Sequence, residues 1–166
     1  ILNDSEDEID KELEEKLKKF YKKKWKVIKN YLMRVIFMPK LYVMIGVPAS
    51  GKSTFAKKLA VKENAIHISR DEIRNSMLKQ GEYFFSKEKQ VYKEFLNQIQ
   101  INLGRGKDVI ADATHLNRES RDKLLRNLAI DYNEIYVIGI IMDTPYKTCI
   151  ERNAKREGVA KVPYKE

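Results

Sequence analysis

The sequence predicts an α/β fold, in which a doubly wound parallel β-sheet is flanked by helices and preceded by an N-terminal helical extension. Four segments are typical of strands, at residues 41–45, 65–69, 108–111 and 135–142, and helical patterns alternate with them. A glycine-rich turn joins the first of these strands directly to a helix. Acidic residues follow the other three strands, at the end of the sheet where ligands bind in folds of this kind.

Composition places the chain among water-exposed globular proteins. Of its 166 residues 43% are hydrophobic, enough for one core, and 34% are charged. Cys149 is the single cysteine, which excludes an internal disulfide framework and is consistent with a reducing compartment. Neither an apolar run of membrane-spanning length nor a secretory signal pattern occurs. We therefore expect a cytoplasmic protein that does not contact a membrane.

Residues 1–38 are expected to form a basic, amphipathic helical extension. Acidic residues dominate its start, and residues 16–29 carry eight lysines and no acid, an order that suits the helix dipole. Apolar residues recur at helical spacing, at Ile9, Leu13, Leu17, Phe20 or Tyr21, Trp25, Ile28 and Leu32. Two interpretations stay open: a helix that packs on the domain and exposes its lysines, or a helix that binds nucleic acid or a partner.

Most of the positive charge lies in the domain expected at residues 39–166. The net charge is +9, and this domain holds 23 Lys and Arg against 16 Asp and Glu. Such an excess favours a polyanionic partner in addition to a nucleotide.

Residues 46–53 form a phosphate-binding loop. They match G-x-x-x-x-G-K-[ST] at every fixed position, after an apolar strand and before a helix, which is the context the motif requires. Its glycines let successive N–H groups point into one concavity, and the helix start adds a positive dipole. Lys52 is expected to reach the β- and γ-phosphates, and the Ser53 hydroxyl to bind Mg²⁺. The nucleotide contacts in this loop are assigned to Gly46, Ala49, Ser50, Gly51, Lys52, Ser53 and Thr54.

The remaining elements follow in regular alternation. Strands and helices are expected at residues 65–69, 70–80, 86–104, 108–111, 117–128, 135–142 and 145–158, with a loop at 81–85. Ser86 is the expected N-cap of the long helix, and Gly104 closes it. Residues 135–142 are nearly all apolar, which predicts a central strand.

Asp71 and Arg74 are three residues apart at a helix start, so they are expected to share a helix face. Asp71 is suited to accept a hydroxyl proton, while Arg74 holds an anionic group of the same substrate. The alternative is structural: Asp71 caps the helix and pairs with Arg74.

Four motifs in order resemble the kinase domain of bacteriophage-type 5′-polynucleotide kinases. They are residues 46–53, 69–74, 110–117, and 151–156 with the Val162-Pro163 pair, and the resemblance covers residues 40–163. It implies a P-loop kinase that transfers the γ-phosphate of ATP, with Mg²⁺, to a 5′-hydroxyl of DNA or RNA.

The resemblance also implies roles for single residues. Asp71 matches the general base, Arg74 the arginine that grips the acceptor's neighbouring phosphate, and Asp112 an aspartate beside the active site. Arg156, and with a weaker match Arg152, correspond to lid arginines over the donor phosphates. A solvated basic helix end is the alternative for these two arginines.

Some expectations concern what the chain lacks or leaves open. Members of that family continue past the Val-Pro pair into more helix, so the domain is expected to be truncated, with additional domains or an oligomer supplying further contacts. His115 is expected to be exposed in a loop, His67 to be a hydrogen-bonded strand residue, and Cys149 to lie in the core. Two rival functions remain: a kinase for a small hydroxylated metabolite or nucleoside, and a nucleotide-dependent binding module or switch.

Overall fold

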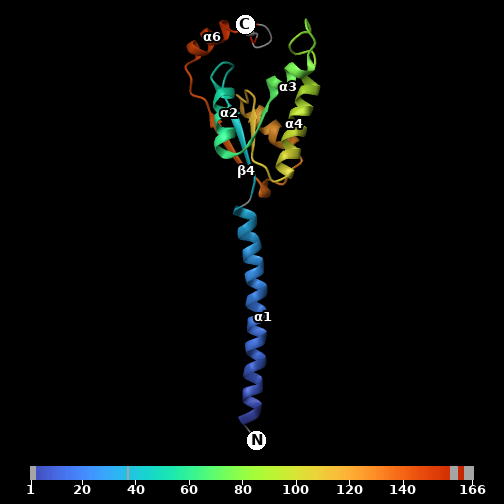
Figure 1. Ribbon diagram of the computed structural model, residues 1–166, viewed down its shortest axis with the longest axis vertical. Coiled ribbons are helices and arrows are strands. Elements are labelled where there is room, and N and C mark those ends of the chain that lie inside the picture. Colours follow the sequence, from blue (N-terminus) through green and yellow to red (C-terminus); the bar gives the residue numbers. More distant parts are fainter. Residues whose placement is uncertain (1–2, 37, 158–160, 163–166) are drawn as a thin grey trace. The chain divides into compact units, whose positions relative to one another are not determined.

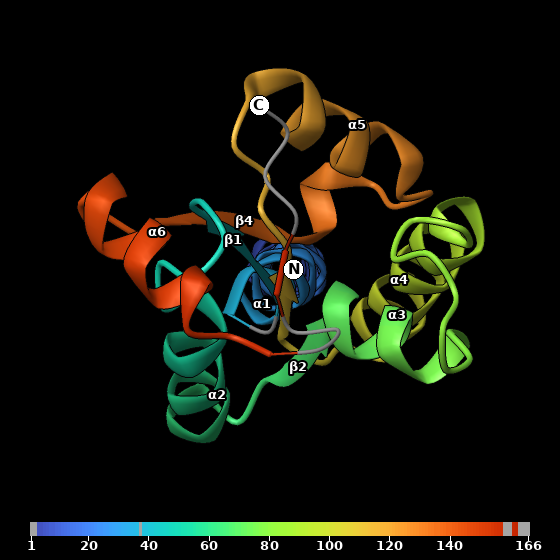
Figure 2. The ribbon, with the colours of Figure 1, turned by 90° about the horizontal axis from the view of Figure 1, so that it is seen from above.

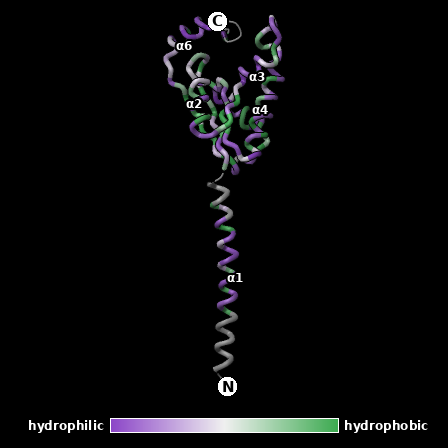
Figure 3. Tube along the Cα trace, viewed as in Figure 1, coloured by the Kyte–Doolittle hydropathy of each residue, from purple (hydrophilic) through white to green (hydrophobic). Residues whose placement is uncertain are grey.

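The computed structural model describes residues 3–36, 38–157 and 161–162. The chain divides into two compact units, residues 1–38 and 39–166, and each is described by itself. The first unit contains helix α1 (Asn3–Ile36). In its described middle part hydrophilic residues predominate (Figure 3), and the apolar residues Leu13, Leu17, Trp25, Ile28 and Leu32 are exposed. None of the described helices combines the length and the apolar character needed to cross a membrane.

The second unit contains a parallel sheet whose strands alternate with helices, as the sequence predicts (Figure 1). Strands β1 (Lys40–Ile45), β2 (Ile66–Ser69), β3 (Val109–Asp112) and β4 (Tyr136–Ile141) lie in the order β2-β3-β1-β4. The connecting elements are α2 (Lys52–Glu63), α3 (Arg70–Met77), α4 (Glu88–Gly104), α5 (Arg118–Asn127), η1 (Tyr132–Glu134) and α6 (Tyr146–Ala154). The register aligns Ser69 with Asp112, so the residues that end β2 and β3 lie side by side.

Helices cover both faces of the sheet (Figure 2). Along β1 the side chains alternate: Leu41 and Val43 pack in the core beneath α4 and α5, and Tyr42 and Met44 pack in the smaller core beneath α2. The four-residue stripe predicted on the long helix, Val91, Phe95, Ile99 and Leu103, is buried in the larger core. The predicted doubly wound α/β fold is therefore confirmed.

Some details of the prediction are wrong. The last helix, expected to reach residue 158, ends at Ala154, before Arg156. Residues 136–141 pair with β1 along their whole length, but among the described residues β4 is an edge strand, not a central one. The side chains of β4 are largely exposed. Their apolar character therefore predicted a strand correctly but did not show whether it lies at the centre or at the edge of the sheet. The long helix begins at Glu88, with Lys87 rather than Ser86 as its N-cap and without a side-chain cap. Ser86 belongs to the preceding turn, where its N–H donates to the carbonyl of Tyr83.

Candidate active site

The phosphate-binding loop has the strained backbone that its glycines allow. Gly51 ends it at φ 93° and is the N-cap of α2. Gly46 has φ 158°, and a Cβ there would lie 2.8 Å from the hydroxyl oxygen of Ser50 and 3.0 Å from the Cβ of Met142, so a larger residue would have to displace these neighbours. Ala49 also has a positive φ, 62°, which is uncommon for a residue with a Cβ. The loop therefore curls tightly ahead of the N-terminus of α2, an arrangement that binds phosphate.

The side chain of Lys52 folds back over this loop. Its Nζ donates a hydrogen bond of 2.7 Å to the carbonyl of Val47, and the residue is 7% exposed. Burial lowers the pKa of Lys52 below its usual value, and the carboxylates of Asp112 and Asp71 oppose that change. The amine is therefore a desolvated positive charge, held where the loop can receive an anion.

Helix α3 presents its acidic residue to the same region. The Ser69 hydroxyl caps the helix by accepting a hydrogen bond of 3.3 Å from the Glu72 N–H, so Asp71 is not the cap. Asp71 lies in the first turn with 62% of its side chain exposed, and it forms an ion pair with Arg74. The predicted proximity of Asp71 and Arg74 is thus present, and the carboxylate remains open to solvent.

Arg74 is held from several sides. It is 5% exposed, and Glu88 accepts hydrogen bonds from its Nη2 at 2.9 Å and its Nε at 3.2 Å. The other oxygen of Glu88 pairs with Arg70. The ring of Phe84 stacks on the Arg74 guanidinium, with its centroid 4.5 Å from Cζ. Because a guanidinium carries five N–H groups and the contacts with Asp71 and Glu88 engage three, Arg74 keeps donors for a further anion.

Asp112 ends β3 and is 4% exposed. Its Oδ2 lies 3.0 Å from Nε2 of His67 on the neighbouring strand β2. This contact fixes the direction of the carboxylate, and it confirms the prediction that His67 is a hydrogen-bonded strand residue.

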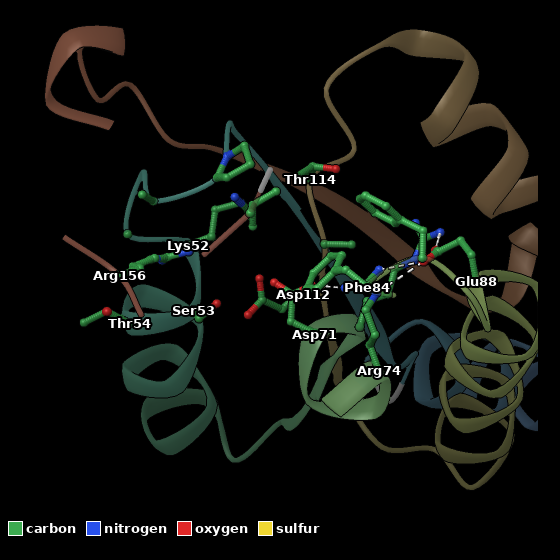
Figure 4. A pocket seen from close by; sticks show the side chains of 17 residues that line it. Lys52, Ser53, Thr54, Asp71, Arg74, Phe84, Glu88, Asp112, Thr114 and Arg156 are labelled. Carbon is green, nitrogen blue, oxygen red and sulfur yellow. Dashed lines mark hydrogen bonds and ion pairs between the residues drawn. The ribbon is translucent and has the colours of Figure 1, made fainter. Parts of the chain in front are cut away.

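These groups line one recess of about 260 Å³. Figure 4 shows Arg156 and Thr54 on one side of Lys52, and Arg74, Phe84 and Glu88 on the other. A second recess lies on the Arg156 side and is lined by Phe55, Lys58 and Arg152, among others. The first recess brings together these predicted site residues: Ala49, Gly51, Lys52, Ser53, Thr54, Asp71, Arg74, Asp112 and Arg156.

Three predicted residues do not line the first recess. Gly46 and the buried Ser50 lie within the loop, where they shape its backbone. The Ser50 carbonyl accepts a hydrogen bond of 2.8 Å from the Thr144 hydroxyl, which ties the loop to the segment after β4. Arg152 lines the second recess instead.

Sequence reasoning missed Glu88, Phe84 and Phe85, which line the recess beside Arg74. The signal for the aromatic residues was three consecutive rings, residues 83–85, in a segment expected to be a loop. Glu88 carries no comparable signal, since acidic residues are common in the first turn of a helix.

The expected exposure of His115 is wrong. The residue is 5% exposed, with a positive φ of 41°, and its Nδ1 donates a hydrogen bond of 3.1 Å to the carbonyl of Met44. Burial is the main cause that lowers its pKa from 6.5 to about 4. His115 therefore has a structural role beneath the site. Cys149, by contrast, is fully buried as predicted.

Comparison with known families agrees with this geometry. Residues 41–165 match the family described as AAA domain. The chain belongs to this family. Within residues 39–166, the AAA domain comprises the phosphate-binding loop, the sheet and the segments that carry Asp71, Arg74 and Arg156.

Two viral proteins resemble the chain in sequence. A protein of Autographa californica nuclear polyhedrosis virus, named bifunctional polynucleotide kinase/RNA ligase, is 32% identical over 145 residues, which cover 78% of this chain and 20% of that protein. A protein of Acanthamoeba polyphaga mimivirus, named bifunctional polynucleotide phosphatase/kinase, is 31% identical over 105 residues, covering 63% of this chain and 21% of that protein. The chain thus spans about a fifth of the length of these relatives.

Solved structures share the fold. A chain of the Pnkp1/Rnl/Hen1 RNA repair complex is 27% identical with a TM-score of 0.60, covering 71% of this chain and 37% of that one. A sugar kinase from Janibacter sp. HTCC2649 is 21% identical with a TM-score of 0.52, covering 75% and 71%, and it shows the fold alone. The two viral relatives confirm the resemblance to polynucleotide kinases that was predicted from the four motifs.

Proposed function

We propose that residues 39–166 catalyse transfer of the γ-phosphate of ATP to the 5′-hydroxyl of a polynucleotide. The observation that carries the proposal is that the phosphate-binding loop and the Asp71–Arg74 pair line one recess. The names of the two viral relatives support the choice of a polynucleotide as acceptor.

The donor would bind across the loop, between the two recesses. The N–H groups at the start of α2 and the ammonium of Lys52 contact the phosphates, and Arg156, which lines both recesses, approaches them from the side opposite Asp71. Charge develops on the phosphoryl oxygens during transfer, so these positive groups stabilise the transition state more than the bound substrate.

The residues present also fit a magnesium ion. The hydroxyl of Ser53 and the carboxylate of Asp112 line the same recess, and both are hard oxygen ligands of the kind that Mg²⁺ binds together with substrate phosphates. When bound, the ion supplies positive charge that neutralises the phosphate oxygens. The His67 contact holds Asp112 in position for that ligand role.

The acceptor would enter on the side of α3. Asp71 accepts the proton of the 5′-hydroxyl while that oxygen forms a bond to the γ-phosphorus and the bond from the γ-phosphorus to the ADP oxygen breaks. The donors that Arg74 keeps beyond its contacts with Asp71 and Glu88 bind the phosphate that follows the terminal nucleoside. A ribonucleoside and a deoxyribonucleoside present the same groups to these two residues.

A labelling experiment tests the proposal. The protein is incubated with Mg²⁺ and γ-labelled ATP in the presence of a 5′-hydroxyl oligonucleotide, the same oligonucleotide already 5′-phosphorylated, or a free nucleoside. Label transfer to the first acceptor alone is the expected result. Transfer to the nucleoside alone would instead identify a kinase for small molecules. Nucleotide binding without transfer to any acceptor would identify a binding module or switch.

A further inference from the structure

Two recesses flank the phosphate-binding loop, and only one of them carries the acceptor machinery. Both include Ala49, Gly51, Thr54 and Arg156. The second recess continues along α2 to Phe55 and Lys58, away from α3. The first continues past Asp71 and Arg74 to Phe84 and Phe85. An acceptor whose hydroxyl reaches Asp71 therefore lies on the side of these aromatic rings.

The segment between α3 and α4 contains an aromatic cluster, which we define as Tyr83, Phe84 and Phe85. Phe85 lies at its centre, with edge-to-face contacts to Phe84 at 4.8 Å and to Tyr83 at 5.8 Å between ring centroids. Phe84 also stacks on the guanidinium of Arg74. The rings thus support one another, and Arg74 anchors them to the acceptor site.

The aromatic cluster is not part of the hydrophobic core. Among the described residues, neither core of the sheet includes any of its rings. Tyr83 is 66% exposed and Phe85 is 36% exposed. Phe85 also lines the first recess, whose other residues are mostly polar or charged. Aromatic surface that stays accessible beside a charged site is suited to bind the flat face of a ligand.

We propose that the aromatic cluster, through Phe85, stacks on the nucleobase of the acceptor's 5′-terminal nucleotide. This inference rests on the proposed function. In such a nucleotide the hydroxyl, the following phosphate and the base all extend from one sugar. With the hydroxyl at Asp71 and the phosphate at Arg74, the base extends along the wall that Phe84 and Phe85 form. Every base has a flat π face, so the contact holds the terminal nucleotide without selecting its sequence.

The first test compares two acceptors that differ only in the terminal base. One is a 5′-hydroxyl oligonucleotide, and the other is the same oligonucleotide with an abasic 5′-terminal residue. Since stacking on an aromatic side chain contributes about 1–3 kcal/mol per base, kcat/KM should favour the complete acceptor by roughly 5- to 150-fold. Phe85→Ala should lower kcat/KM for the complete acceptor much more than for the abasic acceptor, so that the preference largely disappears, and Phe85→Trp should retain the preference.

Phe55→Ala is the matched control, because Phe55 is an exposed ring that lines the second recess. This variant should leave the ratio between the two acceptors unchanged. Equal use of both acceptors by the unmodified protein would overturn the inference. So would an equal loss for both acceptors in Phe85→Ala, or a rise in the KM for ATP in that variant, which would place adenine against the ring.

A binding measurement separates this inference from the proposed function. An oligonucleotide with 2-aminopurine at its 5′ end should lose fluorescence when it binds the protein, and the loss should disappear in Phe85→Ala. Quenching without phosphoryl transfer would support the stacking site and refute the kinase. Transfer without quenching would support the kinase and refute the stacking site.

Discussion

The carboxylate of Glu88 holds the guanidinium of Arg74 in two hydrogen bonds, from Nη2 at 2.9 Å and from Nε at 3.2 Å. The two residues belong to different helices, so this contact fixes α4 against α3 at the acceptor side of the recess. It also directs the remaining N–H groups of Arg74, which makes Glu88 a positioning residue for the proposed phosphate contact.

Replacing Glu88 by glutamine should weaken acceptor binding more than donor binding. Glutamine keeps the size of the side chain but loses its charge, and a hydrogen bond to a charged group contributes about 1.5–3 kcal/mol. The KM for the oligonucleotide should rise roughly 10- to 100-fold while the KM for ATP stays constant. Glu94→Gln on the same helix is the control, because Glu94 contacts only Asn97 and Gln98 in the described hydrogen bonds. A parallel rise in both KM values would contradict the positioning role.

Asp71→Asn should abolish most of the transfer and preserve nucleotide binding. The amide occupies the same space but does not accept the proton, and general base catalysis contributes a factor of about 10²–10⁴. Single-turnover rates with saturating ATP measure the effect. The neighbouring Glu72 pairs with Lys57 at 2.9 Å on the surface, so Glu72→Gln should retain the parent rate. An Asp71→Asn rate within threefold of the parent would refute the assignment.

The two arginines of the predicted lid should differ in importance. Arg156 lines both recesses, whereas Arg152 contributes to the second. Arg156→Ala should lower kcat by about 10²–10³, the typical cost of one transition-state donor, and Arg152→Ala should lower it much less. Steady-state kinetics of both variants provide the comparison. Equal losses would indicate that Arg152, in α6, and Arg156, just after its end, both reach the phosphates.

Lys52 should limit the stability of the nucleotide-free protein. Burial lowers the pKa of Lys52 in the folded state. Below that folded-state pKa the amine is charged in both states, and folding carries the full free-energy cost of burying the charge. This cost decreases as the pH rises from the folded-state pKa to the pKa of the unfolded state. At pH 7, Lys52→Met should therefore raise the Tm of the nucleotide-free protein, while ATP no longer stabilises the variant. The exposed Lys93→Met serves as control. A lower Tm for Lys52→Met would show that the Val47 hydrogen bond outweighs the burial cost.

Local patterns predicted most of the site because its main parts lie close together in sequence. The phosphate-binding loop is one continuous motif, and Asp71 and Arg74 are separated by a single helical turn. To predict each of these parts, it was enough to infer the local conformation of its own segment.

The features that were missed depend on contacts between distant segments. Glu88 meets Arg74 across 14 residues because α3 and α4 pack together. The edge position of β4 follows from the order of strands, which its apolar composition does not encode. His115 follows β3 in a loop pattern, yet its ring bonds to Met44 on β1, 71 residues away.

His115 should make folding stability depend on acidity in a way that a single variant isolates. Its folded pKa of about 4 lies below the usual 6.5, so the unfolded chain gains a proton first as the pH falls. The folded state loses stability between about pH 6.5 and pH 4, and His115 contributes about 2–3 kcal/mol of that loss by pH 4.5.

Asparagine tolerates the positive φ at this position, and its amide can donate to the Met44 carbonyl. His115→Asn should therefore lose that much less stability than the parent between pH 7 and pH 4.5, measured by urea unfolding. Between pH 7.5 and pH 8.5 the difference between the two proteins should stay nearly constant, because the imidazole is almost entirely neutral in both states there. Parallel acid profiles for the two proteins would mean that the ring at position 115 takes up its proton without a burial cost, and the other groups of the fold would then account for all the acid sensitivity.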